Sequence, residues 1–143
     1  MNGLKWWFRI VGAFYLLLAL VNVHGIFIDP SSFTQMEGFG TNPDVVKAFV
    51  VGWSPFAFEI VGIATFMLWA SRDPQKYLSA VWLLVWLEFL HGVLDDMYWI
   101  ANGGSAGFYT AFTVVHLIII VTGILVARQT SAQSPRLARL AAE

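Results

Sequence analysis

Four long apolar stretches alternate with short polar segments along the 143-residue chain. A helix needs about 20 mostly apolar residues to cross the roughly 30 Å hydrocarbon core of a bilayer. Four segments reach this length, over residues 6–28, 45–70, 77–100 and 107–127. The pattern therefore predicts an all-α integral membrane protein with four spans.

The polar segments between these stretches carry helix-ending and helix-starting signals. The sequence DPSS at residues 29–32 ends the first stretch, and TNPD at residues 41–44 supplies an N-cap with proline at the first helical position. SRDP at residues 71–74 and NGGS at residues 102–105 interrupt the chain between the later spans. The apolar stretches are therefore expected to be separate helices.

Basic residues near the ends of the spans decide orientation, because cytoplasmic flanks are rich in Lys and Arg. They gather before span one, between spans two and three, and after span four: Lys5, Arg9, Arg72, Lys76, Arg128, Arg136 and Arg139. Lys47 is the one basic residue of the other two loops, and it lies among acidic residues. Both termini are therefore expected in the cytoplasm, with Trp6, Trp7 and Trp69 at the inner interface.

The short connection between spans two and three makes these helices antiparallel neighbours. We therefore expect residues 1–128 to form an up-down-up-down four-helix bundle, followed by a polar cytoplasmic tail over residues 129–143. The longer first outer loop, residues 29–44, carries Phe33 and Phe39 among glycines. It is either a lid over the outer mouth of the bundle or a plain connection.

Composition agrees with a membrane protein. Hydrophobic residues make up 58% of the chain and charged residues only 12%, against roughly 25% charged in soluble domains. The bilayer is thus the first expected partner, and a net charge of −1 gives no indication of nucleic acid binding. The chain has no cysteine, which excludes disulfides, thiolate metal sites and cysteine nucleophiles.

Several ionisable side chains lie inside the predicted spans: Glu59, Glu88, His91, Asp95 and His116. A charge at membrane depth costs at least ~2.5–3.5 kcal/mol, so such residues mark functional sites by default. On an α-helix, Glu88, His91 and Asp95 share one stripe, being spaced i, i+3 and i+7. We expect these groups to line a polar cavity that opens outward, with Trp99 and Tyr109 in its wall.

Two further faces bear on how the helices pack. In span one, Asn22 and His24 point about 200° apart on an ideal helix, so they cannot both face the bundle. In span two, the face that carries Glu59 also carries Gly52 and Gly62. Small residues allow helices to approach closely, so this face is expected to pack against a neighbour.

The polar groups are compatible with several chemistries. Glu88-x-x-His91, with Glu59 and His116 from other helices, could bind zinc, iron, manganese or copper. Ligation of haem by His91 and His116 is a further alternative. The same groups could hold or pass a proton, or contact a small hydrophobic or amphipathic ligand. They could also form a structural network, in which each contact contributes about 0.6 kcal/mol.

The opening sequence KWWFRIVGAFYLLL, residues 5–18, resembles the start of the BphX-like family of small bacterial membrane proteins. The resemblance implies a bacterial inner-membrane protein and supplies no catalytic residues. We therefore expect a protein that binds a small ligand or metal, with Glu88, His91 and His116 in direct contact. The alternatives are a membrane-embedded enzyme with a His/Glu site for a lipophilic substrate, and a non-catalytic accessory subunit of a larger membrane complex. Further copies of the chain, in a homo-oligomer, are the other protein partner considered.

Overall fold

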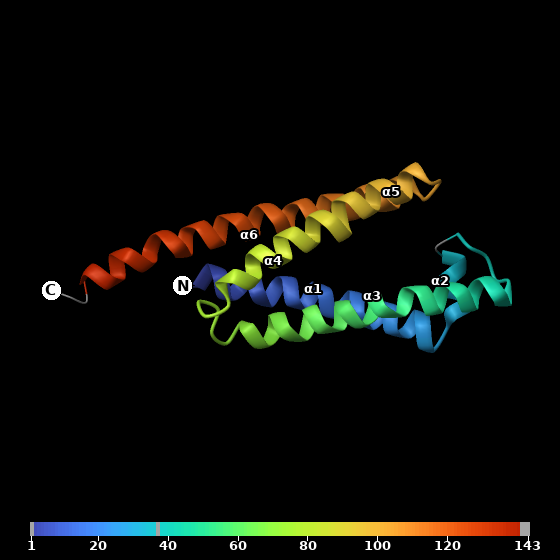
Figure 1. Cartoon of the computed structure of the whole chain (residues 1–143), viewed down its shortest axis with the longest axis horizontal. Helices are drawn as coiled ribbons and strands as arrows, with labels where there is room; N and C mark the ends of the chain where they lie inside the picture. Colours follow the sequence, from blue (N-terminus) through green and yellow to red (C-terminus); the bar gives the residue numbers. More distant parts are fainter. Residues whose placement is uncertain (1, 37, 141–143) are drawn as a thin grey trace. The chain divides into compact units, whose positions relative to one another are not determined.

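The structure, a computed structural model, describes the backbone of residues 2–36 and 38–140 and the side chains of residues 3–35 and 38–132. These residues form helices joined by short turns, with no strand among them (Figure 1). The elements in chain order are α1 (Asn2–Phe27), α2 (Pro30–Met36), α3 (Pro43–Ala70), α4 (Leu78–Leu87), η1 (Glu88–Leu94), α5 (Asp95–Ala101) and α6 (Ala106–Leu140). The predicted all-α class is confirmed.

Four helical stretches of the described chain are long and apolar enough to cross a membrane. They are Gly3–Phe27, Pro43–Ala70, Leu78–Ala101 and Ala106–Ala132. The third is continuous along the chain but changes its winding at η1, which is a π-helix. The molecule is thus a multi-pass membrane protein by the length and composition of its helices, as the hydropathy pattern predicts.

The chain divides into two compact units. Unit 1 comprises residues 1–8 and 70–143, and unit 2 comprises residues 9–69. In unit 1, the α4–η1–α5 stretch packs along α6, and the turn between them makes the two a helical hairpin (Figure 1). Unit 2 contains most of α1, together with α2 and α3 (Figure 1).

Unit 2 is held by apolar packing and one neutral polar contact between α1 and α3. Ile26 of α1 and Ala57 of α3 are buried in one apolar cluster, to which Phe33 of α2 also belongs. The indole Nε1 of Trp53 donates a hydrogen bond to Oδ1 of Asn22 at 2.7 Å. Asn22 is buried while His24 is exposed, which agrees with the expectation that these two side chains point apart.

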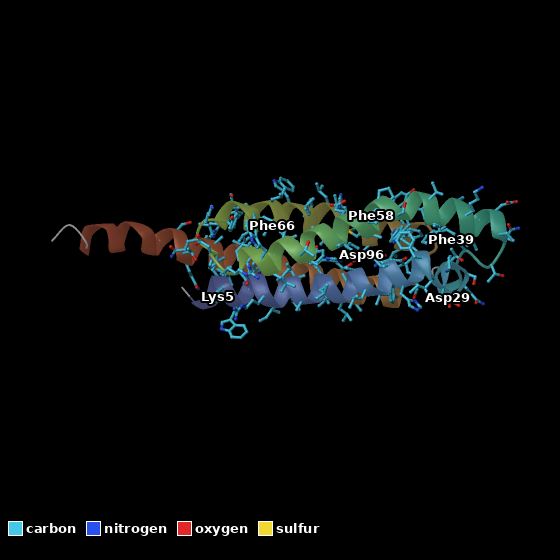
Figure 2. All side chains as sticks on the ribbon, turned by 90° about the horizontal axis from the view of Figure 1, so that it is seen from below. Lys5, Asp29, Phe39, Phe58, Phe66 and Asp96 are labelled. Atoms are coloured by element: carbon cyan, nitrogen blue, oxygen red, sulfur yellow. The ribbon has the colours of Figure 1, made fainter. Side chains whose placement is uncertain are left out.

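The connection between α1 and α3 folds back onto its own unit through α2. Phe33 packs on Gly25, where a Cβ would lie 2.5 Å from the ring. Thr34 is fully buried, and its hydroxyl lies 2.9 Å from the carbonyl oxygen of Gly40. Phe39 rests against Phe49 with ring centroids 5.2 Å apart. The loop is therefore an ordered cap on one end of the α1–α3 pair, the end at which Figure 2 labels Asp29 and Phe39.

Asp29 caps the N-terminus of α2. Its carboxylate accepts hydrogen bonds from the Ser32 backbone N–H at 3.2 Å and from the Ser31 hydroxyl at 3.3 Å. Hydrogen bonding by the Ser32 side chain, and then by its backbone N–H, holds the pKa of Asp29 below its ordinary value. The polar residues that end the first span in the sequence thus also start α2.

Trp7 is buried within unit 1, where its ring lies against Gly123 and its Nε1 donates to Thr122 Oγ1 at 3.0 Å. Two other details differ from expectation. Gly52 and Gly62 are exposed, with no described atom within 4 Å of a Cβ built there. The packed face of α3 instead presents Ala57 and its neighbours at helical spacing. Helix α6 continues beyond the predicted fourth span, to Leu140.

Candidate functional site

The site is built on a local change of helix winding. A regular α-helix has 3.6 residues per turn, so a residue eight positions along lies about 80° away from the first. The π-helix η1 fits more residues into each turn. As a result Glu88, Gly92 and Asp96, spaced i, i+4 and i+8, all lie on the buried face. Such π-turns occur frequently at functional sites.

Glu88 and His116 form a direct carboxylate–imidazole pair across the hairpin. His116 Nδ1 lies 2.6 Å from Glu88 Oε2. Glu88 is 1% exposed, although it lies inside a span. The hydrogen bond joins an acid to a base, so the proton is donated either by an imidazole N–H or by a carboxyl O–H. Either arrangement satisfies a carboxyl group that would otherwise be costly to bury.

Asp96 lies on the other side of the imidazole. Its Oδ2 is 3.9 Å from His116 Nε2 and accepts a hydrogen bond from the Thr113 hydroxyl at 3.0 Å. The first distance is too long for a direct hydrogen bond but short enough for one small polar group to contact both atoms. The side chains of His116 and Asp96 keep 13% and 9% of their surface exposed, whereas that of Glu88 keeps none. Glu88 is therefore fully enclosed, whereas the side chains of His116 and Asp96 each keep a small exposed fraction.

Gly92 allows the imidazole to reach its place. A Cβ built on Gly92 would lie 2.3 Å from Cγ of His116 and 2.4 Å from its Nδ1. No side chain larger than hydrogen fits between η1 and this ring. The backbone of η1 and the ring of α6 are thus in direct contact, and this contact fixes the orientation of the imidazole.

An aromatic stack lies toward the tip of the hairpin, beyond the polar cluster. The rings of Trp99 and Tyr109 are 5.8 Å apart and nearly parallel, with an interplanar angle of 6°. Below them, the ring of Phe112 lies 6.4 Å from that of His116. This stack provides an apolar surface next to the partly exposed His116–Asp96 edge.

The residues predicted for the site divide into three groups. Glu88 and His116 meet directly, and Trp99 and Tyr109 stack on each other. Asp95 is half-buried, and His91 is exposed because the π-turn rotates it away from the buried face. The predicted i, i+3, i+7 stripe assumes α-helical winding, which η1 does not have.

Glu59 belongs to the other unit. It is half-buried on α3 in unit 2, whereas the cluster lies in unit 1. Among residues 3–35 and 38–132, no three His, Asp or Glu side chains gather closely enough to hold a metal ion. The structure therefore lends no support to the metal site assigned to Glu88, His91, His116 and Glu59.

Sequence reasoning missed Asp96 as a member of the site and treated it as a flanking charge. Asp96 follows Glu88 by eight residues, with Gly92 midway. This i, i+4, i+8 spacing of an acid, a glycine and an acid is the available signal, but it is informative only if a π-turn is expected. Thr113 shares a helical face with His116, so the α6 side of the site follows from ordinary periodicity.

The fold and cluster define a class: a multi-pass helical membrane protein with a buried carboxylate–imidazole pair on a π-helical span. The profile of the family described as BphX-like matches residues 1–132 of the chain. The chain therefore belongs to the BphX-like family, and the resemblance of its opening sequence is confirmed. Comparison with the curated proteins and with the solved structures gave no match.

Proposed function

We propose that this protein binds a small amphipathic ligand at the polar cluster formed by Glu88, His116 and Asp96. The observation that carries the proposal is the graded burial of the cluster. The Glu88 side chain is fully enclosed inside a span, while the side chains of His116 and Asp96 keep 13% and 9% of their surface exposed. A ligand hydroxyl or N–H group would contact these two, and its apolar part would lie along the Trp99–Tyr109 stack.

The charge distribution supports a definite placement in the membrane. We propose an up-down-up-down arrangement of four spans in a bacterial inner membrane, with both termini cytoplasmic. Glu88 follows Leu78 by ten residues, or about 15 Å of helix, which places it near the centre of a roughly 30 Å core. The ligand would then enter from the outer side, where the tip of the hairpin lies.

The cysteine-free chain makes this placement simple to test. A single cysteine at Asn102 should react with a membrane-impermeant maleimide added outside intact cells, and one at Arg72 should react only after lysis. The reverse labelling pattern would overturn the orientation.

A small organic ligand fits the donor set better than a metal ion. Nδ1 of His116 is occupied by Glu88, and Oδ2 of Asp96 lies 3.9 Å from Nε2. Among the described side chains, no three His, Asp or Glu residues gather closely enough to hold a metal ion. A tightly bound metal ordinarily takes at least three protein ligands. The proposed ligand is therefore held by hydrogen bonds and apolar contact.

Mass spectrometry of protein purified in mild detergent tests the proposal. Wild type should carry a near-stoichiometric small molecule, and Asp96→Asn and His116→Gln should each lower its amount about tenfold, the effect of roughly 1.4 kcal/mol. Trp53→Phe in unit 2 is the control and should retain it. Equal content in all four proteins, or none in wild type, would contradict the proposal. Stoichiometric zinc, iron, manganese or copper, or a haem spectrum, would replace it with metal binding.

A membrane-embedded enzyme is the second candidate, because one imidazole stands between two carboxylates. This arrangement suits general acid–base chemistry, with Glu88 orienting the ring and Nε2 facing the substrate. Chemical conversion of the bound molecule by wild type, but not by His116→Gln, would favour the enzyme. Co-purification of a second polypeptide in native lipid, with no small molecule bound, would favour an accessory subunit.

A further inference from the structure

The segment from Glu88 to Asp96 carries two overlapping polar patterns. With the π-turn, the i, i+4, i+8 set of Glu88, Gly92 and Asp96 lies on the buried face. In a uniform α-helix, Asp95 would lie about 20° from Glu88 around the axis and Asp96 about 80°. Asp95 would then take the place beside α6 that Asp96 now holds.

Each register therefore brings one of two adjacent carboxylates toward His116. The neighbouring pair Asp95–Asp96 supplies an acid in both cases, while Glu88 is common to both. Gly92 also serves both, because it lies within about 40° of Glu88 in an α-helix. The glycine that receives the imidazole ring is thus compatible with either winding.

His91 makes the two registers chemically different. It is exposed in the present winding, but in a uniform α-helix it would lie about 60° from Glu88. In the α register Asp95 would be the acid nearest to Glu88 around the axis, while His91 and Asp96 would lie on opposite flanks of the buried face. The carboxylate that faces Nε2 of His116 would then be that of Asp95 instead of Asp96.

We infer that η1 is a switch between two helical registers, which exchanges Asp96 for Asp95 at His116. The exchange shifts the helix that follows η1 by one residue, so α5 and the Trp99–Tyr109 stack would move with it. Helix register shifts are established conformational transitions. A role of the switch in regulating ligand access rests on the proposed function. The existence of the two registers does not depend on it.

Paired cysteines in this cysteine-free chain report the register directly. The side chains of Asp96 and Thr113 meet in the present winding, so Asp96→Cys with Thr113→Cys should form a disulfide rapidly in bilayers. Asp95→Cys with Thr113→Cys should form one only in the α register. A minor state populated at 0.1–10% predicts a rate roughly 10- to 1000-fold lower for the second pair.

Deletion of Leu94 supplies the matched control, because Leu94 is exposed, its loss removes the extra residue of the π-turn, and Gly92 keeps its i+4 position after Glu88. In this background Asp96 lies seven positions after Glu88 in a uniform α-helix, so only the Asp96–Thr113 pair should cross-link. Rapid cross-linking of that pair in the deletion background also shows that the variant folds.

The inference is overturned if the Asp95–Thr113 pair cross-links no faster in the full-length chain than in the Leu94 deletion background. The experiment needs no ligand. Absence of a bound molecule would therefore contradict the proposed function without contradicting the register switch. Equal cross-linking in both backgrounds would contradict the switch without contradicting ligand binding.

Discussion

Each of the two units contains a polar contact between apolar helices, but the two contacts differ in their chemistry. In unit 2 the contact is neutral: Trp53 donates to Asn22 within regularly wound helices. In unit 1 it is ionisable: Glu88 meets His116 where the helix changes to π winding. A neutral amide–indole pair is sufficient to fix helix register. The costlier ionisable pair, set in an irregular helix and partly open at Asp96, is therefore the better candidate for function.

The largest expected difference between the units follows from removing one partner of each pair. His116→Leu leaves the Glu88 carboxyl buried without its partner and should lower the free energy of unfolding by about 3–5 kcal/mol. Trp53→Phe breaks a neutral bond and should cost about 0.6 kcal/mol, and at most about 1.7. Reversible unfolding in mixed micelles measures both. Equal losses would remove the distinction between the two contacts.

The glycines give the next largest contrast. Gly92→Ala places a Cβ against the His116 ring, and overpacking of this kind should cost about 1–3 kcal/mol. Gly52→Ala, in an equally apolar helix of unit 2, meets no described atom within 4 Å and should be neutral or stabilise by up to about 1 kcal/mol. The same unfolding assay measures the change in the free energy of unfolding for both variants. A neutral Gly92→Ala would show that the ring does not lie against η1.

Gly25→Ala tests whether close packing on glycine is specific to the site. Its Cβ would meet Phe33, so it should destabilise about as much as Gly92→Ala, again about 1–3 kcal/mol. Unlike Gly92→Ala, it should leave the bound small molecule in place when the purified protein is analysed by mass spectrometry. Loss of that molecule from both variants would mean that global stability, rather than the cluster, controls binding.

The smallest effect concerns the exposed cap of α2. Hydrogen bonds from Ser32 depress the pKa of Asp29, so its stabilisation of α2 is fully present above the unfolded value, about 3.9. That stabilisation is lost as pH falls through the lower folded pKa. The protection factors of the α2 amides against hydrogen exchange, corrected for the intrinsic pH dependence of exchange, should therefore fall at acid pH in wild type. Asp29→Asn keeps a capping oxygen and should show no such pH dependence; an identical dependence would refute the cap.

The contrast between the units also explains what could be predicted from the sequence. The four apolar helices follow from hydropathy and capping residues, because both are local properties of the chain. Depth in the spans and helical phase together predict that Glu88, His116, Trp99 and Tyr109 share a site, although the stacking of the two rings is not predicted. The opposite placement of Asn22 and His24 follows from helical phase.

The missing parts depend on non-local contacts. Asp96 replaces Asp95, and His91 turns outward, because η1 packs against an imidazole on another helix and adopts π winding to do so. The sequence of residues 88–94 alone does not predict π winding. The buried position of Trp7 similarly depends on Gly123, more than a hundred residues away.

The central claim is the direct contact between Glu88 and His116 inside the membrane span. Solid-state NMR in lipid bilayers, with ¹³C in the glutamate carboxyl groups and ¹⁵N in the histidine rings, measures it most directly. The contact of 2.6 Å between Oε2 and Nδ1 predicts a strong carbon–nitrogen dipolar coupling at His116 that disappears in Glu88→Leu. A His116 Nδ1 with no coupling to any glutamate carboxyl carbon in wild type would contradict the account.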